Sequence, residues 1–540
     1  MILALNFVTV SMVLIYTLAD FRCPAFEKQT QCTCREIVWW NNDRMSIVNC
    51  SFLNLKTMPN LSSLSNQNVT KLLLSGNNIS TVSVSDFDVR SISELDLSRN
   101  TLETGGIGTL SQLGADLTKL NLARNRIAID QGLMFIKNLS ILTELILDSN
   151  TIRNYENDSQ ILPDDIFRDL RLHSLRKLSL RSCGITMIEP RAFVGLESIK
   201  EIDLTYNYLE KVPSAILQLK NLERLFLGGN DITKIATDSF VTLDALEEIV
   251  LDYNELSTID DGAFRGLEDS LKELELHANY LSQIPTAAMK QLRKLLFLKI
   301  SKNNIKTIKN AFQGDYTLNM LELDSNPLVF SKNTFQGLEH SLETLFLRDV
   351  GMSIIPVAEL SSLKTLSYLD ISHNHFHRKT FDTDISTLSV KTLVMSNNSL
   401  RHISPSAFIN LRHPIGLDLD NNNISNISFI ISSPPCSFRY VDVTGNPIEC
   451  DCDVEEILHT GIIFGMGLTG VCKLNGTMYE IGSSILAEQL YTFCNRTERI
   501  SWCSGAFQSN RALQSNTGLT LINVWVVFVC FLLNKRWEVK

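Results

Sequence analysis

The chain has 540 residues, a formal net charge of −10 and no long run of basic residues. This charge balance argues against nucleic acid and heparin as partners, because clustered Lys and Arg bind such polyanions. A hydrophobic fraction of 44% is ordinary for a globular extracellular chain.

Residues 1–19 are uncharged and largely apolar, and Thr17, Leu18 and Ala19 offer small residues suited to cleavage before Asp20. This pattern predicts a secretory signal peptide. Because the segment lacks Lys and Arg, an uncleaved signal anchor is the alternative.

Residues 69–446 repeat the pattern apolar-x-x-Leu-x-Leu-x-x-Asn-x-Ile/Leu. Most steps are 23–25 residues and one is 33. The Leu-x-Leu segments predict short strands with alternating inward and outward side chains. About 16 repeats are counted from the Asn slots, which hold Asn77, Asn100, Asn125, Asn150, Cys183, Asn207, Asn230, Asn254, Asn279, Asn303, Asn326, Val350, Asn374, Asn398, Asn422 and Asn446.

This period and consensus are typical of leucine-rich repeats. The resemblance implies an α/β leucine-rich repeat solenoid, a right-handed horseshoe with a parallel concave β-sheet and two disulfide caps. Each Asn amide is predicted to satisfy backbone groups of adjacent repeats. Cys183 offers only a weak donor and Val350 offers none, so we expect an irregularity near Val350.

A second apolar position, often Phe, follows each Asn slot by about ten residues and predicts an aromatic core stack. The 33-residue step contains residues 154–160, which predict a solvated loop, with a ligand-contacting loop as the alternative. The aromatic positions are Phe167, Phe193, Phe240, Phe264, Phe312, Phe335 and Phe408.

The residues between the paired apolar positions are predicted to line the concave face, the usual binding surface of such solenoids. Exposed aromatic residues on three successive strands, rimmed by carboxylates, predict a protein-binding hot spot. The alternative is a set of scattered surface apolar residues. The predicted ligand-binding residues are Tyr206, Phe226, Val250, Tyr253, Asp203, Asp252 and Glu275.

The C-terminal part of the same face is predicted to be acidic, through Asp370, Asp418, Asp420 and Asp442. It would attract a basic partner or Ca²⁺, or it is simply a solvated face.

No metal site, cofactor or enzymatic activity is expected. The sequence His373-x-His375-x-His377 favours a solvated group over a metal site, because no Cys or carboxylate cluster accompanies it. Motifs for nucleophilic, zinc-dependent or phosphate-binding chemistry are missing from the sequence.

Eight cysteines flank the repeats, four on each side. In a secreted chain such clusters predict disulfide frameworks, and solenoids need capping units at their ends. Their spacings resemble the N- and C-terminal caps of extracellular leucine-rich repeat proteins. That resemblance implies the pairs Cys23–Cys34, Cys32–Cys50, Cys450–Cys472 and Cys452–Cys494.

The caps are predicted at residues 20–68 and 447–495. The C-terminal cap lacks the Trp usual in the family, and Ile457 or Leu458 is the expected substitute. Cys183 is predicted to be buried and free, and Cys436 and Cys503 are a candidate further pair.

Sequons predict glycosylation in a secreted chain of this kind. Asn49 is excluded because its sequon contains Cys50. The predicted sites are Asn60, Asn68, Asn78, Asn138, Asn157, Asn397, Asn423, Asn426, Asn475 and Asn495.

Residues 496–518 are predicted to be a stalk, followed by an apolar run at residues 519–533. Small residues, a polar spacer and a hydrophobic tail predict a glycosylphosphatidylinositol (GPI) anchor attached at Ser504. The charged residues after 533 favour the alternative, a short membrane-spanning helix.

In plan, the chain resembles chaoptin-like proteins and Toll-like ectodomains without a signalling domain. The resemblance implies adhesion, recognition or co-reception at the outer face of the plasma membrane, with a protein ligand or a second copy as partner. One alternative is a non-catalytic carrier or regulatory subunit of a secreted enzyme. Another is a single-pass receptor without its own signalling domain.

Overall fold

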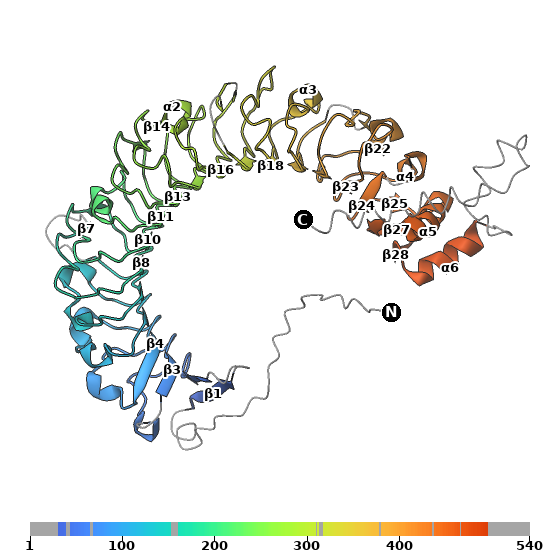
Figure 1. The fold of residues 1–540 in the computed structure, drawn as a ribbon. Helices are drawn as coiled ribbons and strands as arrows, with labels where there is room; N and C mark the ends of the chain where they lie inside the picture. The colour runs from blue at the N-terminus through green and yellow to red at the C-terminus, as the bar shows by residue number, and fades with distance from the viewer. Residues whose placement is uncertain are drawn as a thin grey trace, which may run out of the picture. The chain divides into compact units, whose positions relative to one another are not determined.

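The computed structural model divides into two compact units, residues 1–271 and 272–540 (Figure 1). The predicted signal peptide, insertion loop, stalk and hydrophobic tail fall largely or wholly outside the residues that it describes. Those residues are 31–38, 44–64, 68–152, 160–308, 310–312, 317–376, 380–434, 437–464 and 466–494.

The first unit is built on a parallel sheet to which each repeat contributes one strand. Its first strand, β1, is antiparallel to β2, and β2 already pairs in parallel with β3, so the sheet begins before the first predicted repeat. The strands are β1 Thr33–Val38, β2 Arg44–Asn49, β3 Asn68–Leu73, β4 Ser91–Asp96, β5 Lys119–Asn121, β6 Glu144–Ile146, β8 Lys177–Ser179, β10 Glu201–Asp203, β11 Arg224–Phe226 and β13 Glu248–Val250.

The return segments of the first unit hold two-residue strands and single 3₁₀ turns, which is as much regular structure as a repeat this short accommodates. The strands form the parallel pairs β7 Ile161–Leu162 with β9 Met187–Ile188, and β12 Lys234–Ile235 with β14 Thr258–Ile259. The turns are η1 Ser62–Leu64, η2 Val84–Asp86, η3 Thr104–Gly106, η4 Ser111–Leu113, η5 Ile129–Gln131, η6 Met134–Ile136 and η7 Ser214–Gln218.

The second unit repeats this plan and ends in a cap, which contributes the parallel strand β26 beside β24. Its sheet strands are β15 Glu273–Glu275, β16 Phe297–Lys299, β17 Met320–Glu322, β18 Thr344–Phe346, β19 Tyr368–Asp370, β21 Thr392–Val394, β23 Ile415–Asp418, β24 Phe438–Asp442 and β26 Gly467–Thr469. The return segments hold α2 Thr286–Met289, α3 Val357–Leu360, β20 Thr380–Phe381, β22 His402–Ile403, η8 Pro405–Ala407 and α4 Phe429–Ser432. The cap adds β25 Ile448–Glu449, α5 Cys452–Phe464, β27 Val471–Leu474, β28 Thr477–Glu480 and α6 Ser484–Phe493.

The core follows from the alternation of side chains along each strand. Leu95 and Leu97, for example, are fully buried, whereas Asp96 between them is partly exposed. All seven predicted Phe positions are buried, and neighbouring rings stack, with centroids 6.3 Å apart for Phe167 and Phe193. The aromatic core stack is therefore confirmed.

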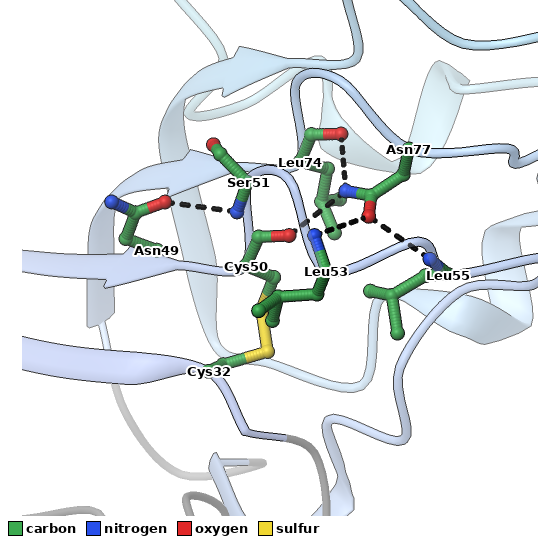
Figure 2. The surroundings of a disulfide bond; sticks show 8 residues. All are labelled: Cys32, Asn49, Cys50, Ser51, Leu53, Leu55, Leu74 and Asn77. Carbon is green, nitrogen blue, oxygen red and sulfur yellow. Dashed lines mark hydrogen bonds between the residues drawn. A yellow bond between two sulfur atoms is a disulfide. The ribbon is translucent and has the colours of Figure 1, made fainter.

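The Asn slots form a hydrogen-bonded ladder between repeats. The Asn125 Nδ2 donates to the carbonyls of Leu97 and Leu122 at 3.0 and 2.9 Å, and its Oδ1 accepts from the Leu102 N–H at 3.0 Å. Figure 2 shows the first rung, where Asn77 bonds the backbone of the N-terminal cap beside a disulfide. Backbone groups that curvature would leave unpaired in the interior are thereby satisfied.

Cys183 and Val350 behave as their chemistry predicts. The Cys183 Sγ lies 3.4 Å from the Leu147 carbonyl, the kind of acceptor that an Asn amide uses elsewhere. The Val350 side chain has no hydrogen-bonding atom and cannot replace the amide of an Asn slot. The Leu328 N–H, which an Asn Oδ1 at position 350 would accept, donates to the Asn326 carbonyl at 2.8 Å. The expected irregularity is thus a tight turn at Asn326–Leu328, one repeat before Val350.

Cys183 is free and buried, as predicted. Burial raises the pKa of its thiol to about 12, and only the thiolate reacts with disulfides and alkylating reagents. We expect no labelling of Cys183 by iodoacetamide at pH 8 in the folded chain and full labelling in 8 M urea, measured by mass spectrometry of the peptide that contains it. Labelling of the folded chain would contradict the burial.

Disulfides close both caps. The predicted pairs Cys32–Cys50, Cys450–Cys472 and Cys452–Cys494 are present. Cys34 is also disulfide-bonded, while its predicted partner Cys23 lies outside the described residues, as do Cys436 and Cys503. Of the two candidates for the missing Trp, Ile457 is buried and Leu458 is partly exposed, so Ile457 takes that place in the core.

Candidate functional site

The sheet face, meaning the outward-pointing side chains of the parallel strands, differs in chemistry between the two units. From β3 to β13 in the first unit, the first outward position of successive strands is charged, with alternating sign: Lys71, Glu94, Lys119, Glu144, Lys177, Glu201, Arg224 and Glu248.

These charges pair across strands, at 2.6 Å for Lys71–Glu94 and 2.8 Å for Lys177–Glu201. The hydrogen bond that Lys177 donates to Glu201 raises the pKa of Lys177. Burial alone would raise the pKa of Glu201, but Lys177 and Arg224 lower it. The column is therefore satisfied within the chain, and a partner would have to desolvate existing ion pairs to bind it.

The predicted site begins beside this column, in the middle outward position. Phe226 on β11 pairs in register with Val250 on β13 and with Asp203 on β10. Phe226 and Val250 are each partly exposed. The next outward position of this repeat, two residues beyond the end of β11, is Gly228, which has no side chain to shield Phe226 from this side.

Tyr206 and Tyr253 do not lie on strands, contrary to the prediction. Each lies three residues beyond its strand, in a left-handed turn with φ of 59° and 52°. Each is 55% exposed. The Asn slot follows immediately, and its inward amide forces the chain to turn here and directs the preceding side chain outward.

The Tyr206 ring lies across the next repeat at Gly229. A Cβ at Gly229 would fall 2.5 Å from the ring, and the φ of +65° at this position also favours glycine. The Arg181 guanidinium lies 5.6 Å from the centroid of the Tyr206 ring. The ring is thus held over Gly229 while most of its surface remains exposed.

The three predicted carboxylates have different roles. Asp203 accepts from the Thr205 N–H at 3.0 Å and lies 3.5 Å from Arg181. Asp252 is a partly exposed residue of the turn after β13. Glu275 is on β15 of the second unit, where Lys299 pairs with it. The first unit therefore brings together six of the seven predicted residues on three successive repeats.

The second unit has a different sheet face. Its first outward column becomes uncharged from β16 onward: Phe297, Met320, Thr344, Tyr368, Thr392, Gly416 and Tyr440. This change of composition was not predicted, because the predicted binding residues on the strands all belong to the middle outward position.

One cation neutralises the middle of this face. Arg348 donates to the Asp324 carboxylate at 2.5 Å, lies 3.9 Å from Asp370, and stacks 5.2 Å from the centre of the Phe346 ring. Burial would lower the pKa of Arg348, but the two carboxylates raise it. Asp370 is buried beside Arg348, so only Asp418, Asp420 and Asp442 remain of the predicted acidic surface.

The histidines show no metal site. His373 and His375 are exposed, and no group of three metal-ligating side chains occurs among the described residues, which exclude His377.

The sequons differ in accessibility. Asn60, Asn68, Asn78, Asn138, Asn423 and Asn475 are exposed, Asn397 and Asn426 are partly buried, and Asn157 and Asn495 lie outside the described residues. The Asn426 Nδ2, the atom that would carry a glycan, donates to Asp451 of the cap at 3.0 Å. The folded geometry thus favours Asn423 over Asn426.

The comparisons with known proteins agree with this architecture. The Leucine rich repeat family model matches residues 173–232, 220–270 and 269–328, and a second Leucine Rich Repeat model matches residues 389–411. Rabbit fibromodulin is 30% identical over 138 residues, which are 25% of this chain and 92% of the fibromodulin sequence. Mouse CD180 antigen is 29% identical over 164 residues, which cover 30% of this chain but only 25% of CD180.

Solved structures show the same fold. A leucine-rich repeat protein of Leptospira interrogans is 26% identical, with a TM-score of 0.52 over 76% of this chain and 93% of that one. The TLR13 chain in a complex with single-stranded RNA is 23% identical, with a TM-score of 0.50 over 77% of this chain and 57% of that one.

These matches define the class as extracellular leucine-rich repeat proteins with similarity to Toll-like ectodomains. The chain belongs to the leucine-rich repeat family. Its relatives are cell-surface or extracellular-matrix proteins.

Proposed function

We propose that this chain is a cell-surface recognition protein that binds an extracellular protein through the first unit. The observation that carries the proposal is the exposed aromatic site of three successive repeats, formed by Tyr206, Phe226, Val250 and Tyr253. Aromatic residues supply large contact area at low entropic cost and dominate protein–protein hot spots. The charged column beside it is satisfied internally and would form a polar rim.

Adhesion, recognition and co-reception are the specific roles that we propose, with a second copy of the chain among the candidate partners. The relatives support a protein-binding role at the cell surface or in the matrix. Nucleic acid is a poor candidate because the chain carries a net charge of −10, although TLR13, which shares the fold, is seen in complex with RNA.

Cells that display the full chain should aggregate, either with one another or with cells that lack it. We expect Phe226→Ala with Tyr253→Ala to reduce aggregation at least tenfold, because hot-spot truncations each cost about 2 kcal/mol or more. The control is Val329→Ala with Ile354→Ala, which truncates two apolar side chains of the second unit that are more exposed than Phe226 and Tyr253.

Equal aggregation by the two variants would refute the site. Spontaneous release of the chain into the medium, in complex with an enzyme, would favour the carrier-subunit alternative.

Membrane attachment is proposed to be through a GPI anchor at Ser504. No helix among the described residues is long and apolar enough to cross a bilayer, and the predicted tail lies outside them. Release by phosphatidylinositol-specific phospholipase C would support the anchor, whereas retention would favour a short membrane-spanning helix.

A further inference from the structure

The last strands of the second unit carry carboxylates that form no ion pair with a Lys or Arg among the described residues. β21, β23 and β24 pair in register, which places Gly416 opposite Tyr440 and Asp418 opposite Asp442. Neighbouring strands lie about 4.8 Å apart, so the Asp418 and Asp442 carboxylates lie side by side. Their outward neighbours Val394, Ser396 and Thr444 are all neutral.

The chain itself shows how this kind of surface is neutralised elsewhere. Arg348 lies between Asp324 and Asp370, which belong to the repeats on either side, and stacks on an aromatic ring. The position equivalent to Arg348 holds Ser372, Ser396, Asp420 and Thr444 in the later repeats. Near β24 the carboxylates Asp418 and Asp442 are therefore not neutralised by an arginine at this position.

Arg439 of β24 makes other contacts on this face. Its guanidinium donates to the Lys391 carbonyl at 3.2 Å and to the Thr392 Oγ1 at 3.1 Å, at the beginning of the strands, and lies 5.9 Å from the centroid of the Tyr440 ring. Among the described residues, no ion pair joins Asp418, Asp420 or Asp442 to a Lys or Arg.

Tyr440 and Val394 provide apolar contact beside these carboxylates. The Tyr440 ring lies across Gly416, where a Cβ would fall 2.2 Å from it, so the ring lies flat on the sheet. The Arg439 guanidinium already lies over this ring, 5.9 Å from its centroid, so a partner guanidinium bound at Asp418 and Asp442 would place its methylene stem against Val394. Arg suits such a site better than Lys because its planar group binds carboxylates in a fork and stacks on rings.

We propose that the sheet face of β21, β23 and β24 binds an arginine-bearing extended segment of a partner protein, through Asp418 and Asp442. This surface, the acidic sheet face, lies outside the aromatic site of the first unit and does not depend on that assignment. Three strands span about 10 Å, a width that suits one extended segment rather than a folded domain.

A calcium ion fits this surface less well. Calcium needs six to eight converging oxygens, whereas the Asp418 Oδ1 already accepts from Ser396 and Asp420, and the Asp442 Oδ1 accepts from Thr444. No three acidic side chains converge among the described residues.

The test uses the full chain and a ten-residue peptide of alternating Arg and Gly, with binding followed by fluorescence anisotropy at 0.15 M salt. We expect saturable binding that weakens at least tenfold in Asp418→Asn with Asp442→Asn. The matched control is Glu94→Gln with Glu144→Gln, which removes the same charge from the paired column of the first unit and should change affinity less than twofold. Phe226→Ala with Tyr253→Ala should leave peptide binding unchanged.

Three results would overturn the proposal. The first is an equal loss of peptide affinity in the control variant, which would mean attraction by net charge alone. The second is displacement of the peptide by millimolar Ca²⁺ but not by Mg²⁺. The third is the lack of saturable peptide binding to the full chain. If the asparagine variant fails to fold, Val394→Lys is used instead. It places a competing cation beside the same carboxylates and should weaken peptide binding to a similar extent. A folded Val394→Lys variant with unchanged affinity would refute the site.

Discussion

Replacing Asn374 by Val is expected to destabilise the second unit by about 3–4 kcal/mol, more than any other single rung replaced in the same way. The Asn374 Nδ2 donates to the carbonyls of Leu347 and Ile371, and its Oδ1 accepts from the N–H groups of Val350 and Met352. A buried backbone group left unpaired costs about 1–3 kcal/mol.

The neighbouring slot explains why Asn374 should be critical. Val350 already interrupts the ladder, and its own N–H depends on Asn374. The Asn374→Val substitution would create two consecutive gaps and leave the N–H groups of Val350 and Met352 without the acceptor they share. The measurement is the urea midpoint together with hydrogen exchange at these two amides.

Two control variants rank the effect. Asn303 lies between intact rungs, and its Oδ1 accepts from the Leu281 N–H, so Asn303→Val should cost about 2 kcal/mol. His375→Ala, on an exposed residue, should change stability by less than about 0.5 kcal/mol. Equal costs for Asn374→Val and Asn303→Val would show that the interruption at Val350 has no energetic consequence.

The architecture was predictable because one short pattern recurs and each of its positions has a single physical role. The inward leucines, the Asn slots and the Phe stack all lie where their spacing predicts. The cap pairings came from the resemblance to extracellular relatives, since four cysteines on each side allow several connectivities. The cap strands β2 and β26 were missed because Cys50 and Gly470 replace the second leucine of the repeat there.

The surface was less predictable because its positions have no fixed chemistry. Periodicity correctly placed Phe226 and Val250 outward on adjacent strands. It wrongly placed Tyr206 and Tyr253 on strands, since the left-handed turn before each Asn slot changes the direction of the side chain. Nor could the sequence alone separate Asp370 from Asp418, because the burial of Asp370 depends on Arg348 from the neighbouring repeat.

The difference between the two sheet faces suggests a division of roles. Charges that pair within the chain stabilise it and discourage contact, whereas an uncharged column beside unneutralised carboxylates leaves interactions for a partner. One solenoid could therefore present two chemically distinct surfaces, one led by aromatic residues and one led by carboxylates. Variants at Phe226 and at Asp418 should then affect different partners, or different parts of one partner.

Removal of the Cys452–Cys494 disulfide is expected to destabilise the C-terminal cap by about 3–4 kcal/mol, which is the loop-entropy value for a closure of this size. The bond ties the first residue of α5 to the end of α6, 42 positions apart. Those helices carry Val454, Ile457, Leu486 and Leu490 into the core. Without the bond, the cap should fray and expose the last repeat, because each repeat of a solenoid is stabilised mainly by its neighbours.

Hydrogen exchange should show where the loss falls. In Cys452→Ser with Cys494→Ser, protection should fall across β24 to β27 and remain unchanged across β3 to β6. The matched variant Cys32→Ser with Cys50→Ser, at the other cap, should show the reverse pattern, because Cys50 adjoins the first rung at Asn77 (Figure 2). Loss of protection along the whole chain in either variant would show that the repeats unfold as one cooperative unit, and that the caps act on all of them rather than on the nearest repeats.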